Sequence, residues 1–414
     1  MTFDEVVNTI ENIHRFGKAT GREVTEELTE LLGHPEAGMK TIHIAGTNGK
    51  GSTSAFISSI LMDADFSVGT FTSPHLVDFR ERITVNGEMI PKEDVARLGS
   101  RLLSLDMKLQ PTMFDYCLGI ALLYFKEKGV DYVVLETGLG GAKDSTAGLS
   151  TVPVVSVITR IGLDHTAILG DSIEKIATEK AGIIKAGTGL VVAKNETEAE
   201  KVILDAGLRV QAQSVSLNSD LYYEDFVKDI ELGIKGKYQK ENAATAVATV
   251  KLLSDIDEFN LPDEVILSGL RKAAWAGRME VLSENPFFLV DGAHNPQGVK
   301  ALYESLMELY PDEKFTFILG VLADKDYEEM IDMMLPLAKS FNTVTVESDR
   351  AVQGERLANI INDKGISARY FNDLEEALVT VLGEANDDER VIAFGSLYFI
   401  GSIKEKVAKL DEFR

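Results

Sequence analysis

A glycine-rich run with a single lysine lies between two apolar stretches near the start of the chain. It reads Gly46-Thr47-Asn48-Gly49-Lys50-Gly51-Ser52. Residues 41–45 before it are expected to form a buried strand, and residues 53–62 after it a helix. Glycines let backbone N–H groups converge on phosphate oxygens, the helix N-terminus adds partial positive charge, the lysine neutralises terminal phosphates, and the serine can hold Mg²⁺. The run therefore predicts a nucleoside triphosphate loop. The alternative is a glycine-rich turn that only closes a βα unit. The commonest phosphate-loop pattern has four residues between its first glycine and Gly-Lys, whereas only Thr47 and Asn48 lie between Gly46 and Gly49-Lys50.

Other polar side chains follow predicted strands. Ser73 lies after a strand at 67–70, Glu136 ends the apolar strand 132–136, and His165 follows the strand 154–159. The carboxyl ends of parallel strands share the ligand-binding edge of an open sheet. Glu136 suits Mg²⁺, which prefers oxygen donors, or else caps the next turn. Ser73 alone could belong to a turn, His165 could be a core histidine, and Lys180 could serve only the dipole of its helix at 172–181.

The order of the predicted elements indicates two α/β domains. Strands at 67–70, 132–136, 154–159 and 190–193 alternate with helices at 92–105, 113–128 and 172–180, after an N-terminal helix at 2–16 and a polar stretch. This alternation predicts a doubly wound, mostly parallel sheet carrying the phosphate loop (P-loop). Helices at 242–253 and 262–272 follow. The pattern restarts near residue 284, with strands at 287–290, 315–319, 343–346 and 390–394 and helices at 297–309, 327–339, 355–364 and 374–382. We expect an ATP-binding domain at 1–284 and a smaller Rossmann-like domain at 285–414.

Composition narrows the classes of partner. The 414 residues carry 42 Lys and Arg against 66 Asp and Glu, a net charge of −24 that disfavours nucleic acid and anionic lipid. No apolar run approaches the roughly 20 residues that span a bilayer, and the N-terminus does not resemble a signal peptide. The single cysteine, Cys117, fits a reducing cytoplasm. No repeats or heptads favour a purely structural role.

In this order the motifs resemble those of the folylpolyglutamate synthase/dihydrofolate synthase branch of the Mur ligase family. The matching segments are 46–52, 72–76, 136–141, 164–170, 179–185, 275–280, 291–296, 320–326 and 395–398. The resemblance implies an ATP-dependent carboxylate–amine ligase of folate biosynthesis and one-carbon metabolism. ATP would phosphorylate a folate carboxylate, and the amine of L-glutamate would displace phosphate from the acyl phosphate. We expect reduced folate, L-glutamate and ATP as ligands of a cytoplasmic monomer.

Residue roles follow from the resemblance position by position. Nucleotide contacts are implied for Gly46, Thr47, Asn48, Gly49, Lys50, Gly51, Ser52, Asn242, Arg278, Asp291 and His294. Two Mg²⁺ ions would be held by Ser52, Ser73, Glu136 and His165. Catalytic roles are implied for Lys50, His165, Lys180 and Arg278, and Lys180 matches a lysine that is carbamylated in this family. Folate or glutamate contacts are implied for Phe114, Asp144, Ser396 and Tyr398.

Three motifs depart from the family pattern. The usual Arg-x-Asp-Ala-Thr-Asn is replaced by residues 142–147, with Ala142 and Ala147 in place of the arginine and asparagine. The usual Thr-x-Phe-Glu ends in Asp115, and the usual Trp-Pro-Gly-Arg has Ala276. The first two lie where the family handles the folate substrate. Folylpolyglutamate synthase and dihydrofolate synthase therefore both stay open as activities. A peptidoglycan-precursor ligase is disfavoured. The remaining alternative is a non-catalytic homologue that binds folate or a nucleotide.

Overall fold

The computed structural model describes residues 1–13, 19–217, 222–386 and 388–411. The chain forms two compact units. Unit 1 comprises Met1–Gly233 and Gln239–Ala274, and unit 2 comprises Ile234–Tyr238 and Trp275–Arg414. The chain therefore passes from one unit to the other three times. The longer part of unit 2 begins at Trp275, ten residues before the expected boundary at 285. Strand β9 (Glu280–Glu284), which lies before that boundary, pairs antiparallel with β10 (Phe287–Val290).

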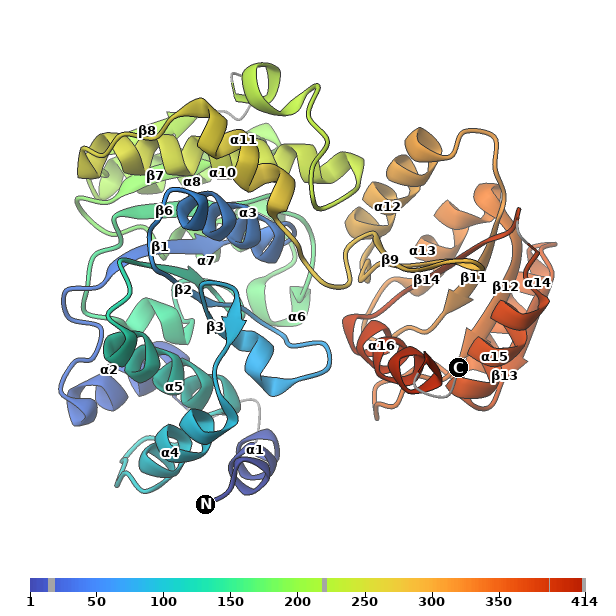
Figure 1. Cartoon of the computed structure of the whole chain (residues 1–414), viewed down its shortest axis with the longest axis horizontal. Helices are drawn as coiled ribbons and strands as arrows, with labels where there is room; N and C mark the ends of the chain where they lie inside the picture. The colour runs from blue at the N-terminus through green and yellow to red at the C-terminus, as the bar shows by residue number, and fades with distance from the viewer. Residues whose placement is uncertain (14–18, 218–221, 387, 412–414) are drawn as a thin grey trace. The chain divides into compact units, whose positions relative to one another are not determined.

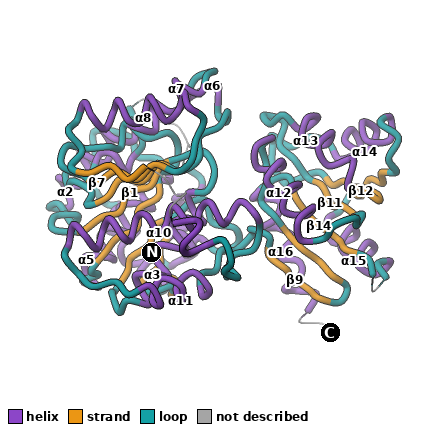
Figure 2. Tube along the Cα trace, turned by 90° about the horizontal axis from the view of Figure 1, so that it is seen from above, coloured by secondary structure: helices purple, strands orange, loops and turns teal. Residues whose placement is uncertain are grey.

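Unit 1 is built on an eight-stranded sheet in the order β4-β3-β2-β5-β1-β6-β7-β8. Only β3 and β4 run antiparallel to their neighbours, so the prediction of a doubly wound, mostly parallel sheet is confirmed. Helix α8 covers one face, and α3, α10 and α11 cover the other (Figure 2). The strands are β1 (Lys40–Ala45), β2 (Val68–Phe71), β3 (Ile83–Val85), β4 (Glu88–Met89), β5 (Tyr132–Glu136), β6 (Val155–Ile158), β7 (Gly189–Val192) and β8 (Ser214–Leu217).

The helices of unit 1 pack on this sheet through two apolar clusters. One joins α1, α2, α4 and α5 to β2 and β5, and the other joins α7 and α8 to β6 and β7 (Figure 1). The α-helices are α1 (Phe3–Glu11), α2 (Gly21–Leu32), α3 (Lys50–Asp63), α4 (Lys92–Leu103), α5 (Met113–Lys128), α6 (Thr166–Leu169), α7 (Ile173–Ala181), α8 (Thr197–Arg209), α10 (Lys237–Asp257) and α11 (Asp263–Lys272). Short turns of other helical types are η1 (Phe79–Arg82), η2 (Ser145–Gly148) and η3 (Tyr223–Val227). The first two residues of α10, Lys237 and Tyr238, belong to unit 2.

Unit 2 has a six-stranded sheet in the order β13-β12-β11-β14-β10-β9, parallel except for β9. Its aromatic core includes Phe317, whose ring lies 5.0 Å from that of Phe341 and 5.5 Å from that of Phe394. The remaining strands are β11 (Phe315–Leu319), β12 (Ala338–Val344), β13 (Ala368–Phe371) and β14 (Arg390–Phe394). The helices are α12 (Pro296–Leu309), α13 (Tyr327–Met334), η4 (Leu335–Leu337), α14 (Gly354–Asp363), α15 (Leu374–Glu384) and α16 (Leu397–Asp411).

The local structure differs from the expectations at four main places. The region predicted as a polar stretch contains α2, which begins with a capping box between Thr20 and Glu23. The helix expected at 327–339 ends at Met334, and β12 already begins at Ala338, because Pro336 cannot continue the hydrogen bonds of a helix. The hairpin of β3 and β4 was not anticipated. Helix α1 ends at Glu11, and the rest of the segment expected to be helical lies partly outside the described residues.

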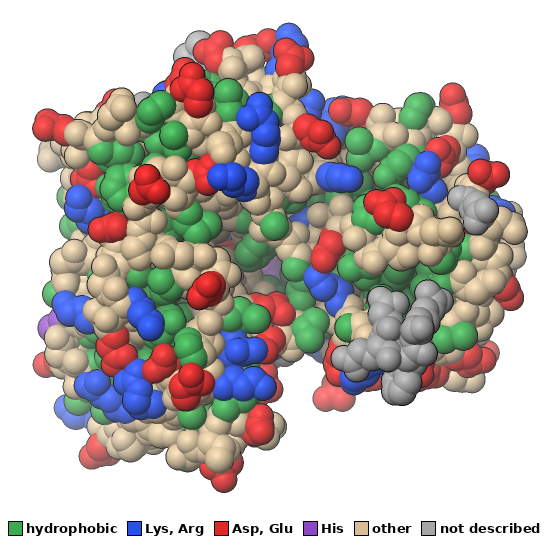
Figure 3. All heavy atoms as spheres, in the orientation of Figure 1, with side chains coloured by type: hydrophobic (Ala, Val, Ile, Leu, Met, Phe, Trp, Pro, Cys, Tyr) green, Lys and Arg blue, Asp and Glu red, His purple; other side chains and the backbone are tan. Residues whose placement is uncertain are grey.

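The surface agrees with the acidic composition. On the face shown in Figure 3, Asp and Glu side chains are scattered among Lys and Arg over both units rather than gathered in one place. None of the helices in the described ranges is long and apolar enough to cross a membrane.

Candidate functional site

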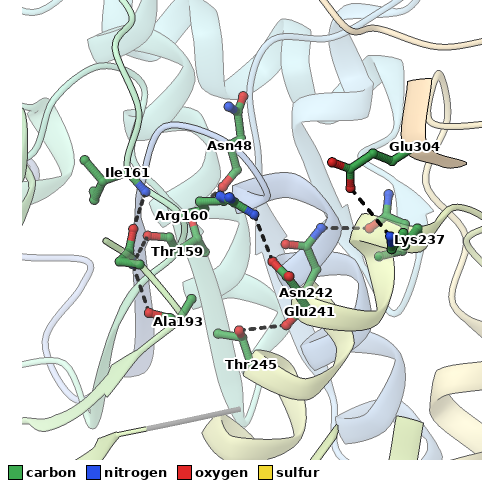
Figure 4. Close-up of polar contacts among 12 residues, drawn as sticks. Asn48, Thr159, Arg160, Ile161, Ala193, Lys237, Glu241, Asn242, Thr245 and Glu304 are labelled. Carbon is green, nitrogen blue, oxygen red and sulfur yellow. Dashed lines mark hydrogen bonds and ion pairs between the residues drawn. The ribbon is translucent and has the colours of Figure 1, made fainter. Parts of the chain in front are cut away.

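The glycine-rich run forms the connection between β1 and α3, as expected. A neighbouring segment holds its backbone: the carbonyl of Arg160 accepts hydrogen bonds from the N–H groups of Thr47 (2.9 Å) and Asn48 (3.1 Å). The hydroxyl of Thr159 donates to the carbonyl of Asn48 at 2.8 Å, and Figure 4 shows these residues around the loop. A β-carbon on Gly46 would lie 1.8 Å from the hydroxyl oxygen of Thr159. The loop is therefore preformed, and it requires glycine where it meets Thr159.

Gly49 and Asn242 meet at the start of α3. Gly49 has φ +88°, and a β-carbon there would lie 2.3 Å from Oδ1 of Asn242. Asn242 belongs to α10, and its Nδ2 donates to Oε1 of Gln239 at 2.9 Å. The structure thus brings the predicted nucleotide contact Asn242 against the predicted phosphate loop. Sequence reasoning missed Gln239, Thr159 and Arg160, because their support of the loop requires no distinctive motif.

Lys50, Glu136 and Ser73 converge at the carboxyl edge of the sheet. The Nζ of Lys50 lies 3.9 Å from Oε1 of Glu136, and the backbone N–H of Ser73 donates to Oε2 of Glu136 at 3.4 Å. Glu136 is buried, with 3% exposure, and Ser52 is buried in the first turn of α3. Three segments distant in the sequence therefore place one cation, one carboxylate and two serines at one strand edge.

This set of side chains fits a hydrated, phosphate-bound divalent cation better than a cation enclosed by protein ligands. Among the residues that the structure describes, no three His, Cys, Asp or Glu side chains gather into a metal-binding group. Mg²⁺ typically keeps several waters and binds one or two carboxylates plus substrate phosphates. His165, the fourth predicted ligand, is exposed at the N-terminus of the short helix α6, in a left-handed conformation with φ +49°. Its ring Nε2 lies 4.0 Å from the carboxylate of Asp164.

Lys180 is buried beneath the phosphate loop. It is 4% exposed, and its Nζ donates to the carbonyl of Gly46 at 2.7 Å. Burial, together with the positive charge of Lys50, lowers the pKa of Lys180 to about 7. Near neutral pH a large share of this side chain is therefore the neutral amine, which is the nucleophilic form.

The segment after Glu136 is organised around the predicted substrate residue Asp144. The Oδ2 of Asp144 accepts from the N–H of Leu139 (2.8 Å), and its Oδ1 accepts from the N–H (3.0 Å) and hydroxyl (2.6 Å) of Thr146. The same hydroxyl lies 2.8 Å from Nε2 of His43, whose pKa burial lowers to about 3. Asp144 is 6% exposed and burial raises its pKa. Both of its oxygens are used within the loop, so this geometry gives Asp144 a role in shaping the loop.

Phe114 and Asp115 attach the start of α5 to this loop. The Phe114 ring lies so close to Gly138 that a β-carbon there would be 2.8 Å from it, and it is 5.4 Å from the ring of Phe71. Asp115 is fully buried and accepts from the hydroxyl of Ser145 at 2.6 Å. Asp115, which stands where the family usually has glutamate, is therefore bonded to Ser145 of residues 142–147, the other segment that departs from the family pattern.

Ala142 and Ala147 leave the loop without the usual cation and amide. The N–H of Ala142 donates to the carbonyl of Glu179 at 2.8 Å, and a β-carbon on Gly182 would lie 2.3 Å from that of Ala142. Ala147 is 3% exposed. Lys143 is exposed, and its N–H donates to Oε1 of Glu179 at 3.1 Å. Within this loop, Lys143 is the cationic side chain closest in sequence to the missing arginine.

In unit 2, Asp291 organises the segment that follows β10. Its Oδ2 accepts from the Tyr238 hydroxyl and the N–H of Met279, each at 2.9 Å, and its Oδ1 accepts from the N–H of Ala293 at 2.8 Å. The backbone of Met279 is left-handed, with φ +45°, and Asp291 accepts its N–H at this turn. Asp291 was expected to contact a nucleotide; here it fixes the backbone around the predicted phosphate residues.

Arg278 and His294 flank the same turn. A β-carbon on Gly292 would lie 2.7 Å from Nη1 of Arg278, and Nδ1 of His294 lies 2.8 Å from the carbonyl of Gly292. Asn295 then caps α12 by accepting from the N–H of Gly298 at 2.7 Å. A guanidinium, an imidazole and a helix N-terminus in one place can hold an anion such as phosphate.

The two predicted glutamate-contacting residues lie where β14 meets α16. Ser396 is 2% exposed, whereas Tyr398 is 41% exposed. Gly395, before them, has φ +122°, and a β-carbon there would lie 2.5 Å from the carbonyl of Gly320. The carboxyl ends of β11 and β14 therefore meet closely, and the predicted segments 320–326 and 395–398 share one edge of the sheet.

Comparison with known proteins identifies both units. Residues 44–250 match the Mur ligase middle domain, and residues 277–397 match the Mur ligase glutamate ligase domain. The chain is 37% identical to the dihydrofolate synthase/folylpolyglutamate synthase of Bacillus subtilis, covering 95% of this chain and 96% of that protein. Among solved structures it resembles Escherichia coli FolC in complex with DHPP and ADP, with TM-score 0.87, 26% identity and 99% of both chains covered. It also resembles the bifunctional Yersinia pestis folylpolyglutamate synthase/dihydrofolate synthase complexed with AMPPNP and a Mn ion. That likeness has TM-score 0.87 and 27% identity, and covers 99% of this chain and 98% of that one.

Proposed function

The chain belongs to the folylpolyglutamate synthase/dihydrofolate synthase branch of the Mur ligase family, and from this premise we propose that it joins L-glutamate to a folate carboxylate at the expense of ATP. The observation that carries the proposal is the convergence of Lys50, Glu136 and Ser73 at the edge of the sheet, beside a preformed phosphate loop and above the buried Lys180. These are the groups that an ATP-dependent ligase needs for phosphoryl transfer. The Bacillus subtilis relative is named for two activities, dihydrofolate synthase and folylpolyglutamate synthase, so we propose both dihydropteroate and folates as acceptors.

The first half-reaction activates a poor electrophile. A carboxylate oxygen of the folate attacks the γ-phosphorus of ATP, ADP leaves, and an acyl phosphate forms. Because the N–H groups of Thr47 and Asn48 are already bonded to Arg160, the N–H groups of Gly49 and of the first turn of α3 would hold the phosphates, with Lys50 neutralising the terminal charge. Asn242, packed against Gly49, would orient the nucleotide beside this loop. Such catalysis depends mainly on positioning and charge stabilisation.

Mg²⁺ fits the oxygen donors at this edge. Glu136, Ser73 and Ser52 would hold it together with phosphate oxygens, and His165 would contribute to a second ion. When bound, the metal supplies charge neutralisation at the transferred phosphoryl group. Lys50 lies 3.9 Å from Glu136, so the positive charge of the lysine offsets the negative charge of the carboxylate within the site.

We propose that Lys180 is carbamylated. The neutral amine adds to CO₂, giving a carbamate and releasing one proton, which replaces a cation by an anion. The lowered pKa of about 7 provides the neutral amine that this reaction needs. Because Lys180 donates to the carbonyl of Gly46, its modification would place the new negative charge beside the phosphate loop, where Lys50 and a divalent cation would balance it.

In the second half-reaction, the amine of L-glutamate attacks the acyl carbon and phosphate leaves through a tetrahedral intermediate. Arg278 and His294 would bind phosphate groups, while Ser396 and Tyr398 would contact glutamate. Residues 138–148 and Phe114 would shape the site for the folate acceptor. Because Ala142 and Ala147 lack the usual charge and amide, we expect acceptor preference rather than ATP use to differ from that of relatives.

The test is ADP release that depends on both glutamate and acceptor, measured in parallel with dihydropteroate, tetrahydrofolate and 5,10-methylenetetrahydrofolate. Mass spectrometry identifies the added glutamate in each product. We expect turnover with dihydropteroate and with at least one reduced folate. Turnover with tetrahydrofolates alone would restrict the protein to polyglutamate synthesis. ADP release that no acceptor stimulates would refute the ligase assignment and favour a binding protein.

A further inference from the structure

The segment that carries Ser73 is held by a short helical turn that sequence reasoning passed over. Residues 72–78 connect β2 to η1, and two consecutive charged side chains of η1, Glu81 and Arg82, contact them. Neither residue belongs to a recognisable catalytic motif. Their contacts lie on both sides of Ser73 and Pro74, and they hold five residues of the segment.

Glu81 gathers the second half of this segment. Its Oε2 accepts from the N–H of Leu76 at 2.7 Å, and its Oε1 accepts from the N–H groups of Val77 at 3.0 Å and Asp78 at 2.8 Å. One carboxylate therefore satisfies three consecutive backbone donors. Charge-assisted bonds of this kind are stronger than bonds between neutral groups, so the turn after His75 is closely defined.

Arg82 secures the first half. Its carbonyl accepts from the N–H of Thr72 at 3.0 Å, and its Nε donates to Nδ1 of His75 at 2.8 Å. The imidazole is therefore neutral and carries its proton on Nε2, which lies 3.6 Å from the carboxylate of Glu11.

The environment of Arg82 is unusual for an arginine. The residue is only 7% exposed, yet none of the ion pairs found in the described part of the chain includes it. A buried guanidinium usually bonds to a carboxylate, whereas Arg82 acts on the carboxylate of Glu11 only electrostatically and donates its Nε hydrogen bond to His75. Its geometry therefore serves the shape of the Ser73 segment.

We propose that Glu81 and Arg82 are positioning residues of the nucleotide–metal site. They fix residues 72–78 so that the backbone of Ser73 stays bonded to Glu136 (3.4 Å), which keeps the two predicted ligands of the divalent cation in register. The inference rests on the proposed function, because that function assigns Ser73 and Glu136 to the metal. It predicts that residues with no contact to the cation set its affinity.

The experiment measures Mn²⁺ binding by electron paramagnetic resonance, using the full chain with a saturating non-hydrolysable ATP analogue. Arg82→Met and Glu81→Gln should each raise the Kd for Mn²⁺ by about tenfold or more, the range typical of residues that support metal ligands. Arg82→Lys, which keeps a donor, should recover part of the affinity. Arg97→Gln is the control for loss of a surface charge, because Arg97 is exposed on α4 and its ion pairs, with Asp94 and Glu127, lie outside residues 72–78.

Thermal melting separates positioning from stability, and binding is measured well below every melting temperature. Variants that melt earlier but bind Mn²⁺ as tightly as the wild type would overturn the inference while leaving the ligase assignment intact. A wild type that binds no Mn²⁺ with the nucleotide would overturn both. Weakened Mn²⁺ binding in Arg97→Gln equal to that in Arg82→Met would also overturn it, since a loss of surface charge would then explain the effect.

Discussion

The rate at which Lys180 reacts with CO₂ should rise with pH and then level off near neutrality. A pKa of about 7 makes roughly 9% of the amine neutral at pH 6 and roughly 91% at pH 8, so the rate at fixed dissolved CO₂ should increase about tenfold over this interval. An ordinary lysine, with a pKa of about 10.4, would instead gain close to a factor of ten for every pH unit up to pH 9 and beyond. The sign follows from burial, which disfavours the ammonium form and moves deprotonation to lower pH.

The assay starts from protein freed of CO₂ and follows the return of ligase activity after dissolved CO₂ is restored at each pH. A ¹³C resonance from labelled bicarbonate should report the carbamate itself. Lys180→Met should abolish both signals. Lys175→Met is the matched control, since Lys175 is exposed on the same helix and the adjacent Asp171 raises its pKa. Two results would contradict this prediction. One is a reactivation rate whose logarithm keeps rising by one per pH unit through pH 9, and the other is a carbamate resonance that persists in Lys180→Met.

Three further results are expected. Lys50→Ala should reduce ATP turnover by about 10²–10³-fold, the cost typical of losing one transition-state donor, with an unchanged melting temperature; near-normal turnover would remove Lys50 from the phosphate site. Gly49→Ala should abolish tight ATP binding, because Gly49 has φ +88° and a β-carbon there would lie 2.3 Å from Asn242. Gly129→Ala is the control: Gly129 has φ +63° and open space around it, so this change should cost only the backbone strain of about 1–2 kcal/mol. Equal nucleotide affinities in the two variants would contradict this expectation. Tyr238→Phe should lower the free energy of unfolding by about 0.5–1.5 kcal/mol through loss of its bond to Asp291, measured by denaturant titration, and an unchanged midpoint would show that the bond contributes nothing.

Periodicity and glycine placement sufficed to predict the parallel sheet, the strand–loop–helix around Lys50 and the restart of the pattern in the second unit. These features depend on local apolar patterns, which a sequence displays directly. The boundary near 285 was harder to place, because β9 gains its structure by pairing with β10 rather than from its own composition. The end of α13 was also misjudged, because a helical pattern continued past Pro336.

The site likewise contains features that the sequence predicts and features that it does not. Glu136 and Ser73 could be placed at one edge of the sheet because strand ends are visible in the sequence. The environment of Lys180 could not be derived, since its burial and the proximity of Lys50 result from tertiary packing. The network of Asp144, Thr146 and His43 was also invisible, because hydrogen bonds between distant segments have no characteristic spacing. The bonds from Glu81 and Arg82 to residues 72–78 were missed because charged residues in a short turn look like ordinary surface.

The three crossings of the chain between the units bear on how such a protein can evolve by recombination. Residues 234–238 belong to unit 2, where Tyr238 bonds to Asp291 and the N–H of Lys237 donates to Ser305 at 2.9 Å, yet the chain then returns to unit 1 for α10 and α11. A single genetic crossover near residue 275 would therefore transplant most of unit 2 while leaving this short segment behind in its original sequence. A productive exchange requires either a matching Tyr238 and Lys237 in the recipient or a second crossover. Because residues 234–238 must match the rest of unit 2, we expect recombination to favour inheritance of the two units together.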